Sequence, residues 1–222
     1  QKEDIPENLE ITDFKQFIQA VKKDEKTVKR IYNEEPEEIV EKRKEKNMDI
    51  SMPCFIIGFK DNDKTENKVR KDIALNILCN ILFSTSSDFY KKMYEDGKIL
   101  SEPSTSYEFS TNYAHLLIQC QTNFVDDLIL EIEKSIQYMK ENGIDDKEFE
   151  ITKRKIYGEF VKDYNNISTI SNNLVNNFFK NINSFDYFEE FESISKEYVE
   201  KVLNEVFDIE KEVISVINPN KE

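Results

Sequence analysis

Residues 50–60 read ISMPCFIIGFK, and residues 72–97 read DIALNILCNILFSTSSDFYKKMYEDG. The first string holds an apolar run that is too short for a helix and is rich in aromatic and β-branched residues. It predicts a strand over residues 48–60, with Pro53 early in the strand or on an edge. In the second string, apolar residues cover most of a helical circumference, so we expect a deeply buried helix over residues 66–83.

A second short helix and a hairpin are expected to follow. Ser86 or Ser87 supplies an N-cap for the helix, and Gly97 supplies the left-handed residue that ends it. Residues 104–110 and 113–121 stand on either side of a Thr-Asn pair, and in the second stretch the side chains alternate between an apolar face and a half-polar face. This pattern predicts two antiparallel strands joined by a tight turn.

The remaining part of the chain reads mainly as helix. Asn123 is expected to cap a first helix, and Asp145 with Glu148 has the spacing of a capping box at the start of a long helix. The long helix is expected to run toward Lys180 with a break near residues 165–168. The last three expected elements are a short turn or helix, a helix capped by Ser195 and a strand, at residues 184–191, 195–206 and 212–217.

These elements predict an α+β fold. Their order is that of a two-layer domain in which one mostly antiparallel sheet is covered by helices on one face. Residues 40–46 are charged and read as an edge strand or a loop, and residues 27–39 read as an extended connector. A helical apolar pattern begins earlier, at Asp13. We therefore divide the chain into residues 1–33, a polar start with a helix and a linker, and residues 34–222, the main domain.

The chain is strongly acidic, with 45 Asp and Glu against 31 Lys and Arg and a net charge of −14. Nucleic acid is excluded as a partner, because affinity for phosphate comes mainly from Lys and Arg. No apolar run approaches the ~20 residues of a transmembrane helix, so no membrane partner is expected. Two interpretations of the charge stay open: solubility, or an acidic chamber that favours basic peptides.

The single histidine and the three cysteines do not predict a metal site. His115 lies on the half-polar face of a predicted strand, and no second histidine stands at i+3 or i+4 to form a helical ligand pair. We expect it at the surface or at a rim. Cys54, Cys79 and Cys120 are odd in number, widely spaced and set among apolar residues. They predict three buried free thiols in a reducing compartment, the cytoplasm.

Three strings resemble the second half of a pitrilysin/insulinase-family zinc metallopeptidase: residues 50–60, residues 72–97, and GIDDKEFEITKRKIYGEFVKDYNN at residues 143–166. The third is similar to the family's pattern of Gly, an acidic cap and a Lys-Arg helix that ends in Gly-Glu-Phe. With the Glu-Glu-Pro-Glu connector at residues 34–37, the chain looks closest to the bacterial elongation factor P modification-associated peptidase homologues. The resemblance covers about residues 34–217, with the tail of a preceding half before it.

The resemblance implies two similar halves around a chamber, with zinc in the other half. In active members the first half carries HxxEH and a distant Glu ligand, and this chain has no HxxEH string. We expect no catalytic and no metal-binding residue here, and zinc only in an N-terminal half or a partner subunit. The second half often gives an Arg and a Tyr to the substrate carbonyl. Tyr94 stands in place of that Arg, and Tyr107 is the next candidate for the Tyr, so both are predicted substrate contacts.

The function that the resemblance implies is that of a non-catalytic C-terminal half. It would wall the chamber and bind peptide or unfolded polypeptide, with strand addition at a sheet edge as one mode. We expect no hydrolysis by this chain alone. The alternative is a catalytically inactive scaffold or assembly subunit of a peptidase-like complex. The expected partners are therefore peptide, the N-terminal half and a homologous subunit.

Overall fold

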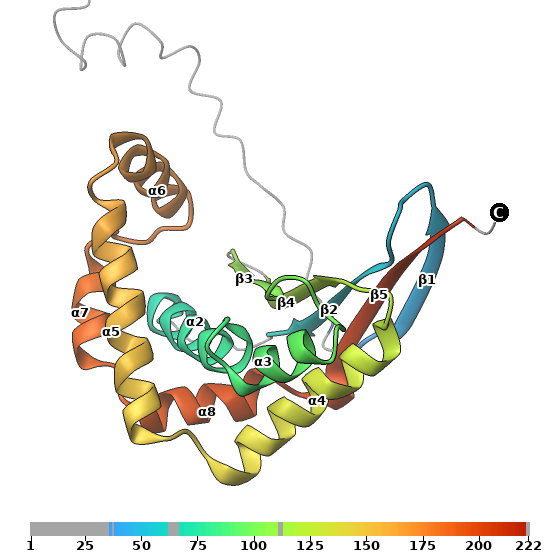
Figure 1. Cartoon of the computed structure of the whole chain (residues 1–222). Helices are drawn as coiled ribbons and strands as arrows, with labels where there is room; N and C mark the ends of the chain where they lie inside the picture. Colours follow the sequence, from blue (N-terminus) through green and yellow to red (C-terminus); the bar gives the residue numbers. More distant parts are fainter. Residues whose placement is uncertain (1–35, 37, 62–66, 111–112, 221–222) are drawn as a thin grey trace, which may run out of the picture. The chain divides into compact units, whose positions relative to one another are not determined.

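A computed structural model describes residue 36 and residues 38–61, 67–110 and 113–220. The helix predicted from Asp13, most of the predicted connector and the Thr-Asn turn of the hairpin lie outside the described residues. Residues 34–222 form one compact unit, and the described residues all belong to it (Figure 1).

Five strands form one mixed sheet in the order β1-β5-β2-β4-β3 (Figure 1). β1 and β5 pair in parallel, and the other three pairings are antiparallel, which confirms the mostly antiparallel sheet. β2 is the central strand. The strands are β1 (Arg43–Met48), β2 (Cys54–Lys60), β3 (Ser104–Phe109), β4 (Ala114–Gln121) and β5 (Glu212–Pro219).

The helices α2, α3, α4 and α8 lie on one side of the sheet, as expected, and α5 and α7 pack against α2 (Figure 1). The predicted long helix is broken into α5 and α6, as expected, by three residues that end at Asn166. The helices are α2 (Lys68–Phe83), α3 (Asp88–Glu95), α4 (Val125–Asn142), α5 (Asp146–Asp163), α6 (Ile167–Phe179), α7 (Asp186–Ser193) and α8 (Lys196–Val206), and a 3-10 turn, η1 (Ile209–Lys211), precedes β5.

The core lies between the sheet and α2. Phe55, Ile57 and Phe59 of β2 are buried, and the residues between them are only half-buried, as the two-residue period of a strand requires. α2 is buried around most of its circumference because the sheet, α5, α7 and α8 all pack against it. Its sequence is accordingly apolar on nearly every side, which confirms the prediction for the helix.

Two strand boundaries differ from the prediction. The strand expected over residues 48–60 is two elements: β1 ends at Met48 and β2 begins at Cys54. Pro53 directly precedes β2, because a proline has no N–H to give to the ladder. The Pro53 carbonyl instead accepts a hydrogen bond from the Thr122 N–H at 3.0 Å. The charged segment at residues 40–46 contains the start of β1, which is an edge strand, one of the two outcomes expected for it.

Most of the predicted caps are confirmed. Ser87 and Ser195 each accept a hydrogen bond at the start of α3 and α8, and Gly97 has φ of 68° after α3. The prediction that Asn123 caps the next helix is wrong. α4 begins after Phe124, and the Phe124 side chain makes no capping hydrogen bond. The buried hydroxyl of Thr122 accepts from the Phe124 N–H at 3.0 Å, and it leaves the Asn123 side chain exposed.

The capping contact of Asp145 supports a first prediction. Asp145 Oδ1 accepts from the Glu148 N–H at 3.0 Å at the start of α5. Asp145→Ala should therefore lower the free energy of unfolding by about 1 kcal/mol, whereas Asp145→Asn, which keeps an acceptor, should lose only a few tenths. Urea denaturation followed by circular dichroism measures both changes. An equal loss in the two variants would mean that the capping contact is not what stabilises α5.

Candidate functional site

One face of the sheet is turned toward the helices, and none of the described helices covers the other face. On this open face Ile56 and Leu117 are half-buried at the centre of the sheet. Toward one end, Lys60, His115 and Glu108 stand side by side across β2, β4 and β3. The open face therefore combines an apolar centre with a row of groups that can carry charge.

The outer side of β3 carries main-chain polar groups that do not pair with β4. The Ser110 N–H donates to the Tyr113 carbonyl at 2.8 Å, which fixes the alternation of the β3–β4 ladder. By that alternation Thr105, Tyr107 and Phe109 direct their N–H and C=O groups to the outer side of β3. A sheet edge of this kind can pair with an extended peptide.

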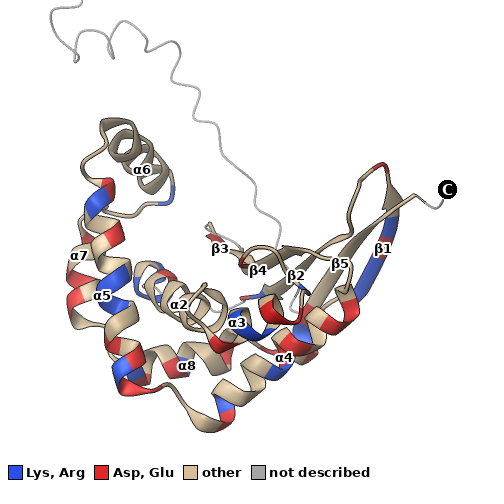
Figure 2. Cartoon of the chain, in the orientation of Figure 1, with Lys and Arg blue, Asp and Glu red and all other residues tan. Residues whose placement is uncertain are grey.

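The opposite edge of the sheet has a different character. β1 reads RKEKNM and carries three basic residues, which Figure 2 shows along that strand. β3 reads STSYEF and carries one charged residue, Glu108. Charged residues, lysine above all, are a common way to block strand addition at an edge. Of the two edges that the structure describes, β3 is therefore the better suited to bind a strand.

Tyr107 belongs to a buried polar network beneath β3. Its side chain lies on the helix-facing side, and its hydroxyl donates to Asp61 Oδ2 at 2.6 Å. Asp61 Oδ1 accepts from Lys71 Nζ of α2 at 2.8 Å, and the two charged side chains are only 3% and 1% exposed. This network joins the end of β2, β3 and α2. Neither Asp61 nor Lys71 belongs to the residues predicted from the sequence to contact substrate.

Tyr94 has different surroundings. It lies on α3, its side chain is 55% exposed, and its ring stacks on that of Tyr90 with 5.7 Å between centroids. The ring of Tyr107 instead contacts Phe109, at 5.3 Å. The two predicted substrate contacts thus differ: Tyr94 has an exposed ring, and Tyr107 has its hydroxyl and ring held on the helix-facing side of β3.

His115 and the three thiols lie where strand alternation puts them. His115 is half-buried on the open face, and its ring stacks on Tyr113 at 5.8 Å. All three cysteines are free; Cys79 and Cys120 are buried, as expected, but Cys54 is only half-buried. Burial raises the pKa of Cys79 to about 12 and that of Cys120 to about 11, so these two thiols stay protonated at neutral pH.

Within residues 38–61, 67–110 and 113–220, no three or more His, Cys, Asp or Glu side chains are grouped so that they could hold a metal ion. In the same part of the chain, every helix is too short or too polar to cross a bilayer.

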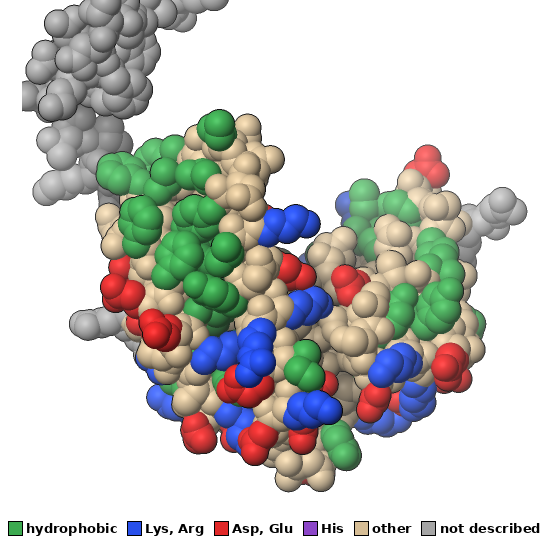
Figure 3. Space-filling model, turned by 60° about the vertical axis from the view of Figure 1, so that its left-hand side comes forward, with side chains coloured by type: hydrophobic (Ala, Val, Ile, Leu, Met, Phe, Trp, Pro, Cys, Tyr) green, Lys and Arg blue, Asp and Glu red, His purple; other side chains and the backbone are tan. Residues whose placement is uncertain are grey.

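An apolar surface covers α6, and we call it the α6 surface. No residue of this helix is buried, and five of its hydrophobic side chains are between 46% and 82% exposed: Ile167, Leu174, Val175, Phe178 and Phe179. The helix carries no charged residue (Figure 2). Figure 3, which brings this side of the molecule forward, shows hydrophobic side chains gathered on it. Exposed apolar patches of this kind mark interaction surfaces.

Comparison with known proteins agrees with the fold and with the predicted relationship. Residues 4–156 match the model of the family described as the peptidase M16 inactive domain, which is more than half of the chain. The uncharacterized zinc protease YmfH of Bacillus subtilis (strain 168) is 25% identical over 201 residues, covering 88% of this chain and 46% of YmfH. The chain therefore spans about half the length of this curated relative.

Solved structures show the same fold. An M16-like peptidase from Alicyclobacillus acidocaldarius superposes with a TM-score of 0.80 at 23% identity, covering 86% of this chain and 46% of that one. A protease from Helicobacter pylori superposes with a TM-score of 0.75 at 18% identity, covering 88% and 48%. The expected pitrilysin/insulinase relationship is confirmed at the level of the family: this chain belongs to the peptidase M16 inactive domain family.

Proposed function

We propose that this chain is the non-catalytic C-terminal half of a zinc metallopeptidase-like protein, that it walls the chamber, and that it binds peptide or unfolded polypeptide. The observation that carries the proposal is the match of residues 4–156 to the inactive-domain family. Zinc and water activation would be supplied by an N-terminal half or by a partner subunit. Free thiols, two of them buried, support a reducing compartment, the cytoplasm.

The β3 edge supports peptide binding by strand addition. An extended peptide would pair with the outward main-chain groups of Thr105 and Phe109, and its side chains would alternate between the two faces of the sheet. Tyr107 lies between these two residues and would contact substrate there, with its hydroxyl held by Asp61. Tyr94 would contact substrate through its exposed ring.

The α6 surface supports a protein partner. Five exposed apolar side chains on one uncharged helix would be covered if the helix packed against the N-terminal half. The same surface fits the second candidate function, an inactive scaffold or assembly subunit, in which it would hold a homologous subunit. The two functions differ in peptide binding and in the activity of the complete assembly.

Hydrolysis separates the two candidates. The purified chain with added zinc should not cleave a fluorogenic peptide, whereas a complex with an M16 half that carries HxxEH should cleave it. An inactive complex that also fails to bind peptide would favour the scaffold function. Zinc-dependent cleavage by the chain alone, abolished by a chelator, would overturn the assignment of this half as non-catalytic.

A proline substitution on β3 tests the binding mode. Thr105→Pro removes one outward N–H and leaves the ladder to β4 intact, since proline is tolerated at such edge positions. We expect it to weaken binding of a fluorescein-labelled peptide of alternating Val, Thr and Lys by about tenfold or more, measured by fluorescence anisotropy. Thr105→Val loses the same hydroxyl but keeps the N–H, so it should bind like the wild type. Equal affinities of the two variants would exclude strand addition at β3.

A further inference from the structure

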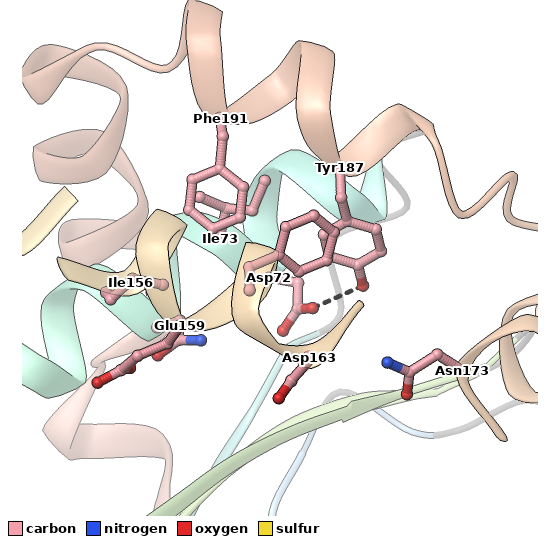
Figure 4. A pocket seen from close by; sticks show the side chains of 10 residues that line it. Asp72, Ile73, Ile156, Glu159, Asp163, Asn173, Tyr187 and Phe191 are labelled. Carbon is pink, nitrogen blue, oxygen red and sulfur yellow. Dashed lines mark hydrogen bonds between the residues drawn. The ribbon is translucent and has the colours of Figure 1, made fainter. Parts of the chain in front are cut away.

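A pocket of about 310 Å³ lies among α2, α5, α6 and α7 (Figure 4). This volume is at the lower end of the range for ligand sites, so the pocket has room for one side chain rather than for a whole peptide. No Lys or Arg is among its lining residues. Three aromatic rings and three carboxylates form much of its wall: Phe160, Tyr187, Phe191, Asp72, Glu159 and Asp163.

Asp72 enters the pocket from α2 with one oxygen still available. The Tyr187 hydroxyl donates to Asp72 Oδ2 at 2.8 Å, and no described residue donates to Oδ1. Burial raises the pKa of Asp72 to about 6, so the carboxylate is charged at neutral pH without a direct cationic partner. In Figure 4 the Asp72 carboxylate points toward the part of the pocket that holds Asp163 and Asn173, while Glu159 extends to the other side.

The lysine whose charge acts on Asp72, Lys180, makes its direct contacts with other residues. Lys180 lowers the pKa of Asp72 through space, but its ammonium lies 3.9 Å from Glu108 Oε2 and 4.3 Å from the centroid of the Phe109 ring. Both of those contacts are with β3. The negative charge of the pocket is therefore left for a ligand to neutralise.

The aromatic wall selects the type of cation. Phe160 packs on Tyr187 and Phe191 with ring centroids 5.5 and 5.6 Å apart, and this gives the pocket a fixed apolar side. Such rings attract ammonium and guanidinium groups and cover the apolar stem behind them. A divalent metal fits less well, because the described residues offer no group of three ligands for it. The chemistry is that of a Lys or Arg side chain.

We propose that this pocket binds the charged end of a Lys or Arg side chain of a peptide. The stem would lie against Phe160 and Tyr187, and the charged group would donate to Asp72 Oδ1 and Asp163. This inference deepens the proposed peptide binding and rests on it. It gives part of the acidic charge of the chain a defined role, the recognition of basic sequence positions in a bound peptide.

The test uses two small probes that differ in charge. Nα-acetyl-L-arginine amide should shift amide NMR signals of pocket residues such as Ile73, Ile156 and Tyr187. The neutral Nα-acetyl-L-citrulline amide should bind with an affinity that is lower by about tenfold or more. Asp72→Asn and Asp163→Asn should each weaken binding of the arginine probe severalfold. Asp163 is exposed, so its variant keeps the fold even if Asp72→Asn does not. Glu192→Gln removes the same charge from an exposed site on α7 outside the pocket and should change nothing.

Failure of this inference can be told apart from failure of the proposed function. If citrulline binds as well as arginine, or if Glu192→Gln weakens binding as much as Asp163→Asn, the pocket does not recognise a basic side chain. A labelled peptide in which norleucine replaces Lys should bind more weakly than its parent. Equal binding of the two peptides would reject the pocket and leave peptide binding intact. Binding of the arginine probe in the pocket without binding of any peptide would keep the pocket as a site for a basic group and reject the proposed peptide binding.

Discussion

Lys71→Met is expected to lower the free energy of unfolding by about 3–5 kcal/mol, because it removes the ammonium that a buried carboxylate contacts directly. Lys71 Nζ lies 2.8 Å from Asp61 Oδ1, and the Asp61 side chain is only 3% exposed. After the substitution, Asp61 would keep the Tyr107 hydroxyl bond but lose the ammonium. Urea denaturation followed by circular dichroism measures the loss.

A double-mutant cycle is the control for this pair. Asp61→Asn should also destabilise the protein, since it removes the carboxylate charge that lies 2.8 Å from the buried Lys71 ammonium. The double variant should lose less than the sum of the two single losses, because neither charge then remains. Strict additivity would contradict the idea that the two side chains act as one ion pair. Because Tyr107 connects Asp61 to β3, we expect amide signals of β3 to shift in both single variants.

The features that the sequence predicted well depend on short stretches of chain. The apolar run of β2, the two-residue alternation of β4 and the all-round apolar sequence of α2 each report burial directly, because the period of the element decides which side chains share a face. Caps such as Ser87 and Asp145 are equally local. The wrong prediction that Asn123 caps α4 also has a local cause. Two neighbouring residues both had side chains that can cap a helix, and Thr122 made the contact.

The features that the sequence did not predict depend on residues far apart in the chain. β1 pairs in parallel with β5, and nothing in the charged string RKEKNM specifies a partner at the other end of the domain. The pocket likewise combines Asp72, Glu159 and Tyr187 from three helices. Lys71 was the one local signal available, as a lysine within a helix predicted to be buried on nearly every side, and it did pair with a carboxylate.

Glu212 makes stability depend on pH in a direction that can be measured. It begins β5 on the helix-facing side opposite Phe59, it is 1% exposed, and no donor in the described part of the chain lies within hydrogen-bond distance of its carboxylate oxygens. Burial and the neighbouring Glu133 carboxylate raise the pKa of Glu212 to about 7, from the ordinary value of 4.5. The Lys42 ammonium, 3.6 Å away and half exposed, only partly offsets these effects.

A raised carboxyl pKa means that the folded chain holds a proton that the unfolded chain releases between pH 4.5 and about 7. Stability from this group is therefore full below pH 4.5 and is lost as the pH rises through 7. Glu212→Gln should raise the free energy of unfolding at pH 8 by roughly 1–3 kcal/mol relative to the wild type, and this gain should shrink as the pH falls toward 5.

Urea denaturation at several pH values measures the gain from Glu212→Gln, with Glu210→Gln, an exposed neighbour in η1, as the control that should follow the wild type. Asp72 adds a slope of the same sign in all three proteins, because burial also raises its pKa. The comparison therefore depends on the difference between variants at each pH rather than on any single curve. A gain that is constant across the pH range would show that Glu212 is not the group that titrates.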